Sequence, residues 1–285
     1  MSDAPVSAIL VSYHSGPVLW RALEALGAQS ALREILLVDN GNPTNVRAEL
    51  DRRAAAGKLR LIRSERNLGF AAACNLAAAA AQGELLLFLN PDAIMPSEGL
   101  RRMVTTMAGK PRPWLAGARL VGADGVERRG GRRGELTPCT ALGDALGFDS
   151  FNRHRQPLPP RPAELPTVSG ACLLIPAADF RALRGFDEGY FLHVEDIDLC
   201  RRLRAGGGKV WFLPDVRIEH EGASSDAPSL TVERHKLASF LHYFRRYYGL
   251  RPDALIVMAL ITMRYWLRAP FLWLADRRRQ AGATP

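Results

Sequence analysis

The feature that most constrains this chain is an alternation of short apolar runs with helical patterns near its N-terminus. Apolar, β-rich runs occur at residues 6–13, 34–39, 59–63 and 84–89, and helical periodicity separates them, as at residues 46–56 and 71–81. Strands that are apolar throughout and are joined by helices are typical of a sheet covered on both faces. The sequence therefore predicts an α/β fold with a Rossmann-like, mostly parallel sheet flanked by helices.

Polar side chains follow the ends of these predicted strands. In open α/β sheets, ligands bind beyond the carboxyl ends of the strands. Taken singly, each polar residue could be only a turn or cap residue. Together they predict a ligand site at this edge, formed by Ser12, His14, Asp39, Asn40, Asn67, Asn90 and Asp92.

The second half of the chain is less regular. Further strands are expected at residues 114–121, 168–176 and 209–213, with a helix from Glu195 to the glycines at 206–208. The segment ERRGGRRG at residues 127–134 is expected to be a flexible basic loop. Residues 156–166 contain five prolines, so no regular element is expected there.

A long apolar segment near the C-terminus differs from the rest of the chain. Residues 254–275 carry only two charges, Arg264 and Arg268, and arginines flank both ends. Its length is near the roughly 20 residues that span a bilayer, but each central arginine would cost about 2.5 to 3.5 kcal/mol there. The favoured prediction is a helix in the membrane interface. A buried helical hairpin and a true membrane span remain as alternatives.

Charge and cysteine usage narrow the partners and the compartment. The chain has 38 Lys and Arg against 29 Asp and Glu, a net charge of +9, which suits phosphate groups and anionic lipid or simply a solvated surface. Its four cysteines include no CxxC pair, which argues against a zinc ribbon or a disulfide scaffold. No signal peptide is visible, so we expect a cytoplasmic protein that is peripheral on the cytoplasmic face of the membrane.

Seven segments follow one another in a fixed order on this scaffold. They are VSYHSG, LVDNGN, RNLGFAAACN, FLNPDA, SGACLLIP, GFDEGYFLHVEDIDLCRRLRAGG and IEHEGASS. In this order the chain resembles the family 2 glycosyltransferases of the GT-A fold, and most closely their rhamnosyltransferase-like bacterial branch. The resemblance covers about residues 6–225. It implies a GT-A domain over residues 1–225, and we expect a helical, membrane-interacting extension over residues 226–285.

The resemblance also implies an activity. Such an enzyme is a metal-dependent, inverting transferase that moves a sugar from a nucleotide-diphosphate donor to a hydroxyl group. Rhamnose is favoured, so dTDP-rhamnose ranks before UDP-sugars as donor. The acceptor would be a glycan of the cell envelope or a lipid-linked glycan.

The donor site is carried over from the family residue by residue. Asp39 would accept the imide N–H of uracil or thymine, although it could be only a turn residue before Gly41. The segment around Ala71 could likewise be only a tightly packed helix start. The expected donor-binding residues are Ser12, Tyr13, Asp39, Asn67, Gly69, Asn75 and Asn90.

A divalent cation is implied at the strand end that carries Asn90 and Asp92. These two residues occupy the place of the family's DxD motif, and only Asp92 supplies a carboxylate. His220 matches a family histidine that reaches the same metal, so the cofactor is expected to be Mg2+ or Mn2+, with imidazole favouring Mn2+. A plain strand-end turn is the competing interpretation of Asp92.

The catalytic candidates begin the late helix. Asp196 matches the family's catalytic aspartate, and a helix N-terminus favours the ionised form that a general base requires. Glu195 would contact substrate or orient the loop. Ordinary N-terminal capping is the competing interpretation of both carboxylates. Gly170, Ala171 and His193 are the expected acceptor or sugar contacts, and the basic loop at residues 127–134 could hold acceptor phosphate or merely be solvated.

Two other classes of protein were weighed against a transferase. A sugar-nucleotide pyrophosphorylase needs a glycine-rich loop with Lys or Arg after the first strand, and SYHSGPVLW lacks it. A non-enzymatic membrane- or nucleic-acid-binding protein should gather its cations into a stripe with aromatics. Here the arginines are spread over many predicted helices, with the cluster at residues 242–246 as the local exception, so nucleic acid is not an expected partner.

Overall fold

A nine-stranded mixed sheet forms the centre of the protein in the computed structural model, which describes residues 4–220 and 228–282. The strand order is β3-β2-β1-β4-β10-β6-β11-β5, with β8 beside β11. The first four strands in this order run parallel: β3 (Arg60–Arg63), β2 (Leu32–Asp39), β1 (Val6–Ser12) and β4 (Leu85–Leu89). The other members are β10 (Cys172–Pro176), β6 (Trp114–Val121), β11 (Lys209–His220), β5 (Ala93–Ile94) and β8 (Ala163–Glu164).

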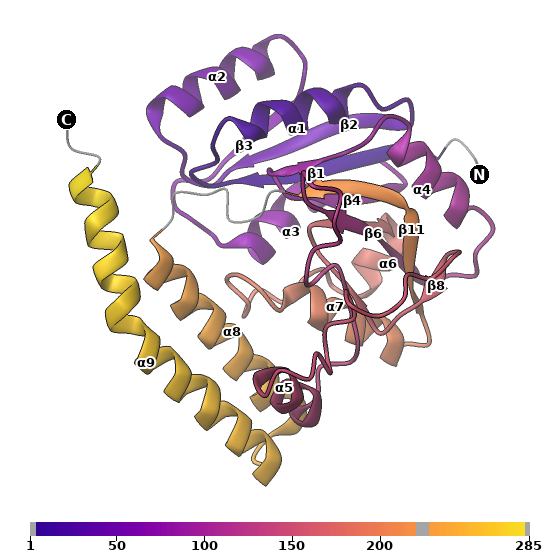
Figure 1. Ribbon diagram of the computed structural model, residues 1–285. Coiled ribbons are helices and arrows are strands. Elements are labelled where there is room, and N and C mark those ends of the chain that lie inside the picture. The colour runs from indigo at the N-terminus through magenta and orange to yellow at the C-terminus, as the bar shows by residue number, and fades with distance from the viewer. Residues whose placement is uncertain (1–3, 221–227, 283–285) are drawn as a thin grey trace.

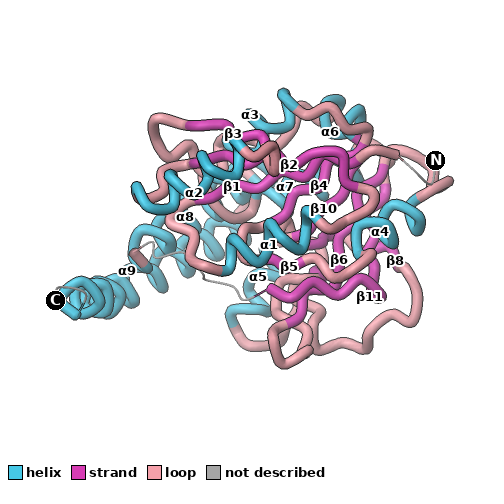
Figure 2. Tube along the Cα trace, turned by 90° about the horizontal axis from the view of Figure 1, so that it is seen from above, coloured by secondary structure: helices cyan, strands magenta, loops and turns pink. Residues whose placement is uncertain are grey.

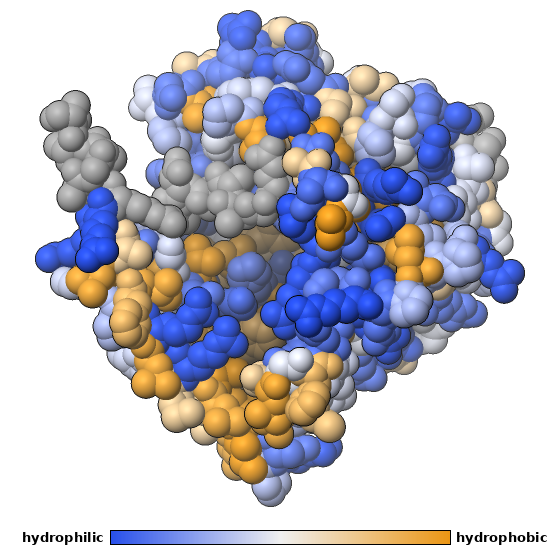
Figure 3. All heavy atoms as spheres, viewed as in Figure 1, coloured by the Kyte–Doolittle hydropathy of each residue, from blue (hydrophilic) through white to orange (hydrophobic). Residues whose placement is uncertain are grey.

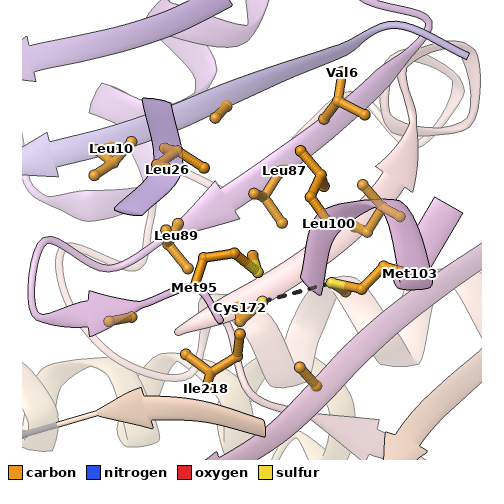
Figure 4. Packing of buried hydrophobic residues seen from close by; sticks show 14 of the residues in the cluster. Val6, Leu10, Leu26, Leu87, Leu89, Met95, Leu100, Met103, Cys172 and Ile218 are labelled. Carbon is orange, nitrogen blue, oxygen red and sulfur yellow. Dashed lines mark hydrogen bonds between the residues drawn. The ribbon is translucent and has the colours of Figure 1, made fainter. Parts of the chain in front are cut away.

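Helices cover both faces of the sheet, as the apolar strands require (Figures 1 and 2). Neighbouring residues of one strand enter opposite cores: Leu10 packs with α1 and α4, whereas Ile9 packs on the face of α3, α6 and α7. Figure 4 shows the first core, in which Leu26 and Met103 come from the helices and Leu87 from β4. The helices are α1 (Val18–Gly27), α2 (Thr44–Ala55), α3 (Phe70–Ala80), α4 (Gly99–Met107), α5 (Pro138–Ala145), α6 (Ala177–Ala182) and α7 (Glu195–Ala205).

The direction of β10 is the main departure from a uniformly parallel sheet. β10 runs antiparallel to both of its neighbours, β4 and β6. Its amino end therefore lies at the carboxyl end of β4, where the amide of Asn90 donates to the carbonyl of Ala171 at 3.0 Å. This reversal brings the small-residue segment SGA to the edge that carries the polar strand ends.

Four local expectations were wrong. The single strand expected at residues 168–176 is divided between two sheets, because only residues 172–176 form β10 and residue 168 belongs to a short strand of a second sheet. The basic segment 127–134 contains β7 (Arg132–Arg133), which pairs with β9 (Thr167–Val168), and Arg132 is buried against Glu127. The proline-rich segment 156–166 contributes the two-residue strand β8 to the sheet edge. The strand that was expected to end at Leu213 continues to His220 after an irregularity.

The C-terminal part is a helical hairpin of α8 (Ser229–Tyr248) and α9 (Pro252–Gly282) (Figure 1). Val257 and Met258 of α9 pack with Tyr243 and Phe244 of α8. The carboxylate of Asp276 accepts from the first two amides of α8, both at 3.0 Å. Within the described residues, α9 is the one helix that is long and apolar enough to cross a membrane by length and composition.

The outer face of α9 is exposed, so the hairpin is not a buried one. Trp266, Leu267 and Phe271 are 67%, 65% and 73% exposed. The side chain of Arg268 is also exposed (46%), but it points toward α8, where it approaches Glu233 at 3.7 Å. Figure 3 shows the resulting band of hydrophobic residues along this edge of the molecule.

Candidate active site

Asn90, Asp92 and His220 form one cluster at the carboxyl end of β4. The Nε2 atom of His220 lies 3.2 Å from Oδ1 of Asp92 and 3.3 Å from Nδ2 of Asn90. The sheet register explains the approach, because His220 at the end of β11 pairs with Ala93, the residue after Asp92. Both expected metal ligands are therefore neighbours, although they are far apart in sequence.

The donor set of this cluster suits a cation that substrate helps to bind. It offers one carboxylate and one imidazole, and the described part of the chain holds no group of three His, Cys, Asp or Glu side chains that could bind a metal alone. Mg2+ in proteins is commonly bound by one or two carboxylates together with substrate phosphates. Imidazole is a better ligand for Mn2+ than for Mg2+. The residues fit a divalent cation whose coordination the diphosphate of a donor would complete.

Asp196 lies at the start of α7 and is held by three donors. Its Oδ2 atom accepts from the amide of Gly170 at 2.8 Å and from the guanidinium of Arg133, and its Oδ1 atom accepts from the amide of Ile197 at 2.8 Å. A Cβ on Gly170 would lie 3.1 Å from the Cβ of Asp196, so this approach favours glycine. Gly170 therefore positions the candidate base.

The two carboxylate sites lie at the same edge of the sheet. Gly170 binds Asp196, the next residue Ala171 accepts from Asn90, and the side chain of Asn90 contacts His220. Figure 3 shows that this face of the molecule is hollowed near its centre. A cavity of about 860 Å³ lies elsewhere, among α1, α2 and the amino ends of β2 and β3, where α/β sheets do not usually bind ligands.

Glu195 differs from its neighbour in its surroundings. It is 6% exposed, and its Oε2 atom has no hydrogen-bond partner among the described residues. Burial, and then the charge of Asp196, raises the pKa of Glu195 to about 8. Glu195 is therefore mostly protonated at neutral pH, which favours Asp196 as the general base.

The backbone before α7 is strained. His193 and Val194 have φ angles of 66° and 75°, and such a conformation is an outlier for a β-branched residue. Val194 is nevertheless buried, packed with Tyr190 and Ile197, whereas the side chain of His193 is exposed. Strain of this kind persists only where the surroundings enforce it, and it concentrates at functional sites.

A turn around Asp39 forms one end of the expected nucleotide slot. Oδ1 of Asp39 accepts from the amides of Gly41 and Asn42, and Oδ2 accepts from Nε of Arg47 at 3.1 Å. Burial alone would raise the pKa of Asp39, but the hydrogen bonds from Asn42 and the charge of Arg47 hold it below its usual value. The side chain is 0% exposed. Asp39 therefore does stabilise the turn at Gly41, which was the alternative role considered from the sequence.

Two asparagines complete this slot: Asn40, which the sequence placed at the ligand-binding edge, and Asn42, which it did not single out. The side chain of Asn42 accepts from Ser12 Oγ at 3.0 Å and donates to Asp39. Asn40 donates to Oδ1 of Asn67 at 2.8 Å and accepts from the amide of Leu68. Their only sequence signal was their place in the strand-end segment LVDNGN. The ring of Tyr13 lies 3.4 Å from a Cβ built on Gly41, so Tyr13 borders the same turn.

Gly69 and Asn75 brace the loop that leads to Glu195. Gly69 has a φ of 80°, and a Cβ there would lie 2.5 Å from the carbonyl oxygen of Phe191. The side chain of Asn75 exchanges two 2.9 Å hydrogen bonds with the backbone of Phe186 and also donates to Glu188. The structure thus gives both residues a role in supporting this loop, apart from any contact with a donor.

Arg133 is the residue that sequence reasoning missed most clearly. Its side chain is 12% exposed, pairs with Asp196, and donates to the carbonyl of Val168 at 3.3 Å. One arginine in an arginine-rich segment gives no sequence signal of such a role. The pairing of β7 with β9 places it.

Comparisons with known proteins identify the family of this chain. The family model described as Glycosyl transferase family 2 matches residues 7–181. N-acetylglucosaminyl-diphospho-decaprenol L-rhamnosyltransferase of Mycobacterium tuberculosis (strain ATCC 25618 / H37Rv) is 25% identical over 93% of this chain and 87% of its own length. The matched range of the family model ends before Glu195 and Asp196.

Solved structures resemble the fold. GalNAc-T7 with UDP, GalNAc and Mn2+ has a TM-score of 0.62 and 19% identity over 88% of this chain, which spans about half (52%) of that chain. The mannosyltransferase PcManGT from Pyrobaculum calidifontis, in complex with GDP-Man and Mn2+, has a TM-score of 0.59 and 17% identity over 98% of this chain and 76% of that chain. At these identities the likeness concerns the fold.

Proposed function

The chain belongs to glycosyl transferase family 2 and has the GT-A fold, and we propose that it is an inverting rhamnosyltransferase. The observation that carries this proposal is the meeting of Asp92 with His220, and of Asp196 with Gly170, at one edge of the sheet. The donor would be dTDP-rhamnose, with UDP-sugars as the second choice. The relative from M. tuberculosis, a rhamnosyltransferase named for a lipid diphosphate, supports rhamnose and a lipid-linked acceptor.

A single displacement accounts for the residues present. The acceptor hydroxyl oxygen forms a bond to the anomeric carbon as the bond from that carbon to the diphosphate oxygen breaks. The hydroxyl proton passes to Asp196, and the nucleoside diphosphate leaves with the electron pair. One attack from the face opposite the leaving group inverts the anomeric centre.

The hydrogen bonds of Asp196 favour this role. Its Oδ2 atom accepts from both Arg133 and Gly170, whereas Oδ1 accepts, among the residues that the structure describes, only from Ile197. A carboxylate oxygen has two lone-pair sites, so Oδ1 keeps capacity for the acceptor proton. Arg133 and Gly170 would thus orient the base without occupying the oxygen that reacts.

A divalent cation held by Asp92 and His220 would neutralise charge on the departing diphosphate. The side chain of Asn90 would lie beside these ligands, since its Nδ2 atom is 3.3 Å from Nε2 of His220. In the nucleotide slot, the turn at Asp39, with Ser12, Tyr13 and Asn67, would select a pyrimidine base. Arg47 covers Oδ2 of Asp39, so a base that binds this oxygen must displace it.

The direct test is a panel of nucleotide sugars, with Mn2+ or Mg2+, in which donor hydrolysis and transfer to a lipid-linked glycan are measured. We expect dTDP-rhamnose to be turned over at least about 10-fold faster than any other donor and the anomeric configuration of the product to be inverted. Turnover of a purine-linked donor in preference, or a retained configuration, would contradict the proposal.

We further propose that α9 lies in the cytoplasmic surface of the membrane. Its outer face is apolar over several turns, and the exposed Arg277 and Arg278 follow it, a combination that suits an anionic lipid interface. With α8 packed on its inner face, the apolar face could enter the lipid while the transferase domain stays in water.

Replacing Trp266, Leu267 and Phe271 by serine together should weaken binding to anionic vesicles by at least about 10-fold. Each such side chain contributes about 1.5 to 3 kcal/mol when it is fully buried, so even partial burial of three gives this effect. The measurement is co-sedimentation of the full chain with the vesicles. Phe148→Ser, at an equally exposed site of 74%, is the matched control. Unchanged sedimentation of the triple variant would refute the membrane assignment.

A further inference from the structure

The segment from Phe186 to Val194 connects β10 and α6 to the start of α7 and leads directly into Glu195 and Asp196. It has no regular secondary structure, but hydrogen bonds and a ring contact attach it to neighbouring helices. On one side, the amide of Phe70 in α3 donates to the carbonyl of Phe191 at 2.8 Å, and the side chain of Asn75 bonds the backbone of Phe186. We call this segment the catalytic loop.

α8 holds the opposite side of the catalytic loop. The hydroxyl of Ser239, which is 1% exposed, donates to the carbonyl of Leu192 at 2.9 Å. The ring of His235 stacks on Phe191 with centroids 4.0 Å apart and an interplanar angle of 18°. These contacts lie one and two residues before the strained pair that begins at His193.

Charged and polar side chains of α8 also contact the catalytic loop and α7. Oδ2 of Asp187 is paired with Arg246 and lies 3.2 Å from Nε2 of His242. Farther along, the hydroxyl of Tyr247 donates to Oδ1 of Asp198 in α7 at 2.6 Å. α8 therefore contacts the catalytic loop near both ends and the helix that follows it.

Strained backbone requires such support. His193 and Val194 have positive φ angles, and residues keep such a conformation only where the surrounding structure enforces it. In the described structure, α3 and α8 both hold the loop before this pair, and Tyr190 of the loop also donates to Asp198 of α7 at 3.5 Å. If one side were released, the turn could relax and the carboxylate of Asp196 would move relative to Gly170.

We propose that Ser239, His242 and Arg246 of α8 are positioning residues for Asp196, so that the catalytic unit extends to Tyr248 and does not end near residue 225. This inference rests on the proposed role of Asp196. It gives the hairpin two separable tasks: α8 shapes the active site, and the outer face of α9 meets the membrane. In functional terms, the catalytic unit then ends between α8 and α9.

Two substitutions in the full chain test this proposal. Ser239→Ala removes the bond to Leu192 and introduces no bulk. Asp187→Asn removes the charge that pairs with His242 and Arg246, while its amide oxygen can still accept from the amide of Gly189, as Oδ1 does at 2.9 Å. The matched controls both lie in α9: Thr262→Ala removes a hydroxyl bond to a backbone carbonyl, and Asp253→Asn removes a pair with Arg251.

The first readout is hydrogen exchange of the amides in the catalytic loop, which needs no substrate. We expect exchange to be at least about 10-fold faster in Ser239→Ala and in Asp187→Asn than in the wild type, and unchanged in both controls. The second readout is the ratio of sugar transfer to donor hydrolysis. We expect this ratio to fall about 10-fold in each variant and about 100-fold in the double variant, since a displacement of about 1 Å can cost that much.

A general loss of folding would lower transfer and hydrolysis together, so the ratio separates positioning from stability. Loop exchange that is unchanged, or an unchanged ratio despite faster exchange, would overturn the proposal. If the wild type transfers no sugar, the proposed function fails, and loop exchange alone still decides whether α8 holds the loop. If Asp196→Asn remains active while Ser239→Ala lowers the ratio, the loop is positioned for another base, and the link to Asp196 is overturned.

Discussion

Asp196→Asn should reduce sugar transfer by about 10³-fold while donor binding is retained. General base catalysis contributes about 10² to 10⁴ in rate, and an amide cannot accept the acceptor proton. The substitution keeps the shape of the side chain, and its amide oxygen can still accept from Gly170. The measurement is the transfer rate at saturating donor, together with the dissociation constant of the donor by calorimetry.

Glu195→Gln is the companion variant for this experiment. Because the raised pKa of Glu195 leaves it mostly protonated at neutral pH, an isosteric amide changes little, and transfer should stay within about 10-fold of the wild type. Near-normal turnover of Asp196→Asn, with inactivity of Glu195→Gln, would move the base to Glu195. Loss of donor binding in Asp196→Asn would show that the substitution disturbs the site more widely.

The second large effect is expected for Asp92→Ala, which should lower both donor hydrolysis and transfer by about 10² to 10³-fold. A bound cation supplies several kcal/mol of charge stabilisation at a leaving phosphate, and each 1.36 kcal/mol is a factor of ten in rate. Removal of Asp92 leaves His220 as the remaining side chain of the proposed pair. The assay compares rates over a range of Mn2+ concentrations.

Chelator provides the internal control. EDTA should bring the wild type down to the rate of Asp92→Ala and should have no further effect on that variant. Asp124→Ala, at an exposed loop position, is the matched carboxylate control and should behave as the wild type. If chelator and Asp92→Ala both leave the rate unchanged, the cation has no role in the reaction.

Membership of a glycosyltransferase family does not depend on the roles proposed for these residues. Family membership supports a glycosyltransferase over the pyrophosphorylase and the non-enzymatic binding protein that the sequence had left as alternatives. The metal, the donor, the acceptor and the membrane contact are proposals that the experiments above address separately.

The sequence by itself determined the layers of the fold and the edge that carries the site. Burial on both faces makes a strand mostly apolar, so β1 and β4 could be located from their continuous apolar runs. Because parallel strands share the edge at which they end, Asp39 and Asp92 could be assigned to one edge of the sheet. Helical spacing likewise predicted that Arg268 and the apolar pair Leu267 and Phe271 lie on different faces of α9.

How distant segments meet could not be derived from local patterns. The pairing of Arg133 with Asp196 joins residues 63 apart, and the contact of Asn90 with His220 joins residues 130 apart. Periodicity records which face of an element is buried, but it records neither the direction of a strand such as β10 nor the partner on which α8 packs. These depend on the summed packing and hydrogen bonding of the whole chain, and they turned a basic loop and a C-terminal helix into parts of the candidate site.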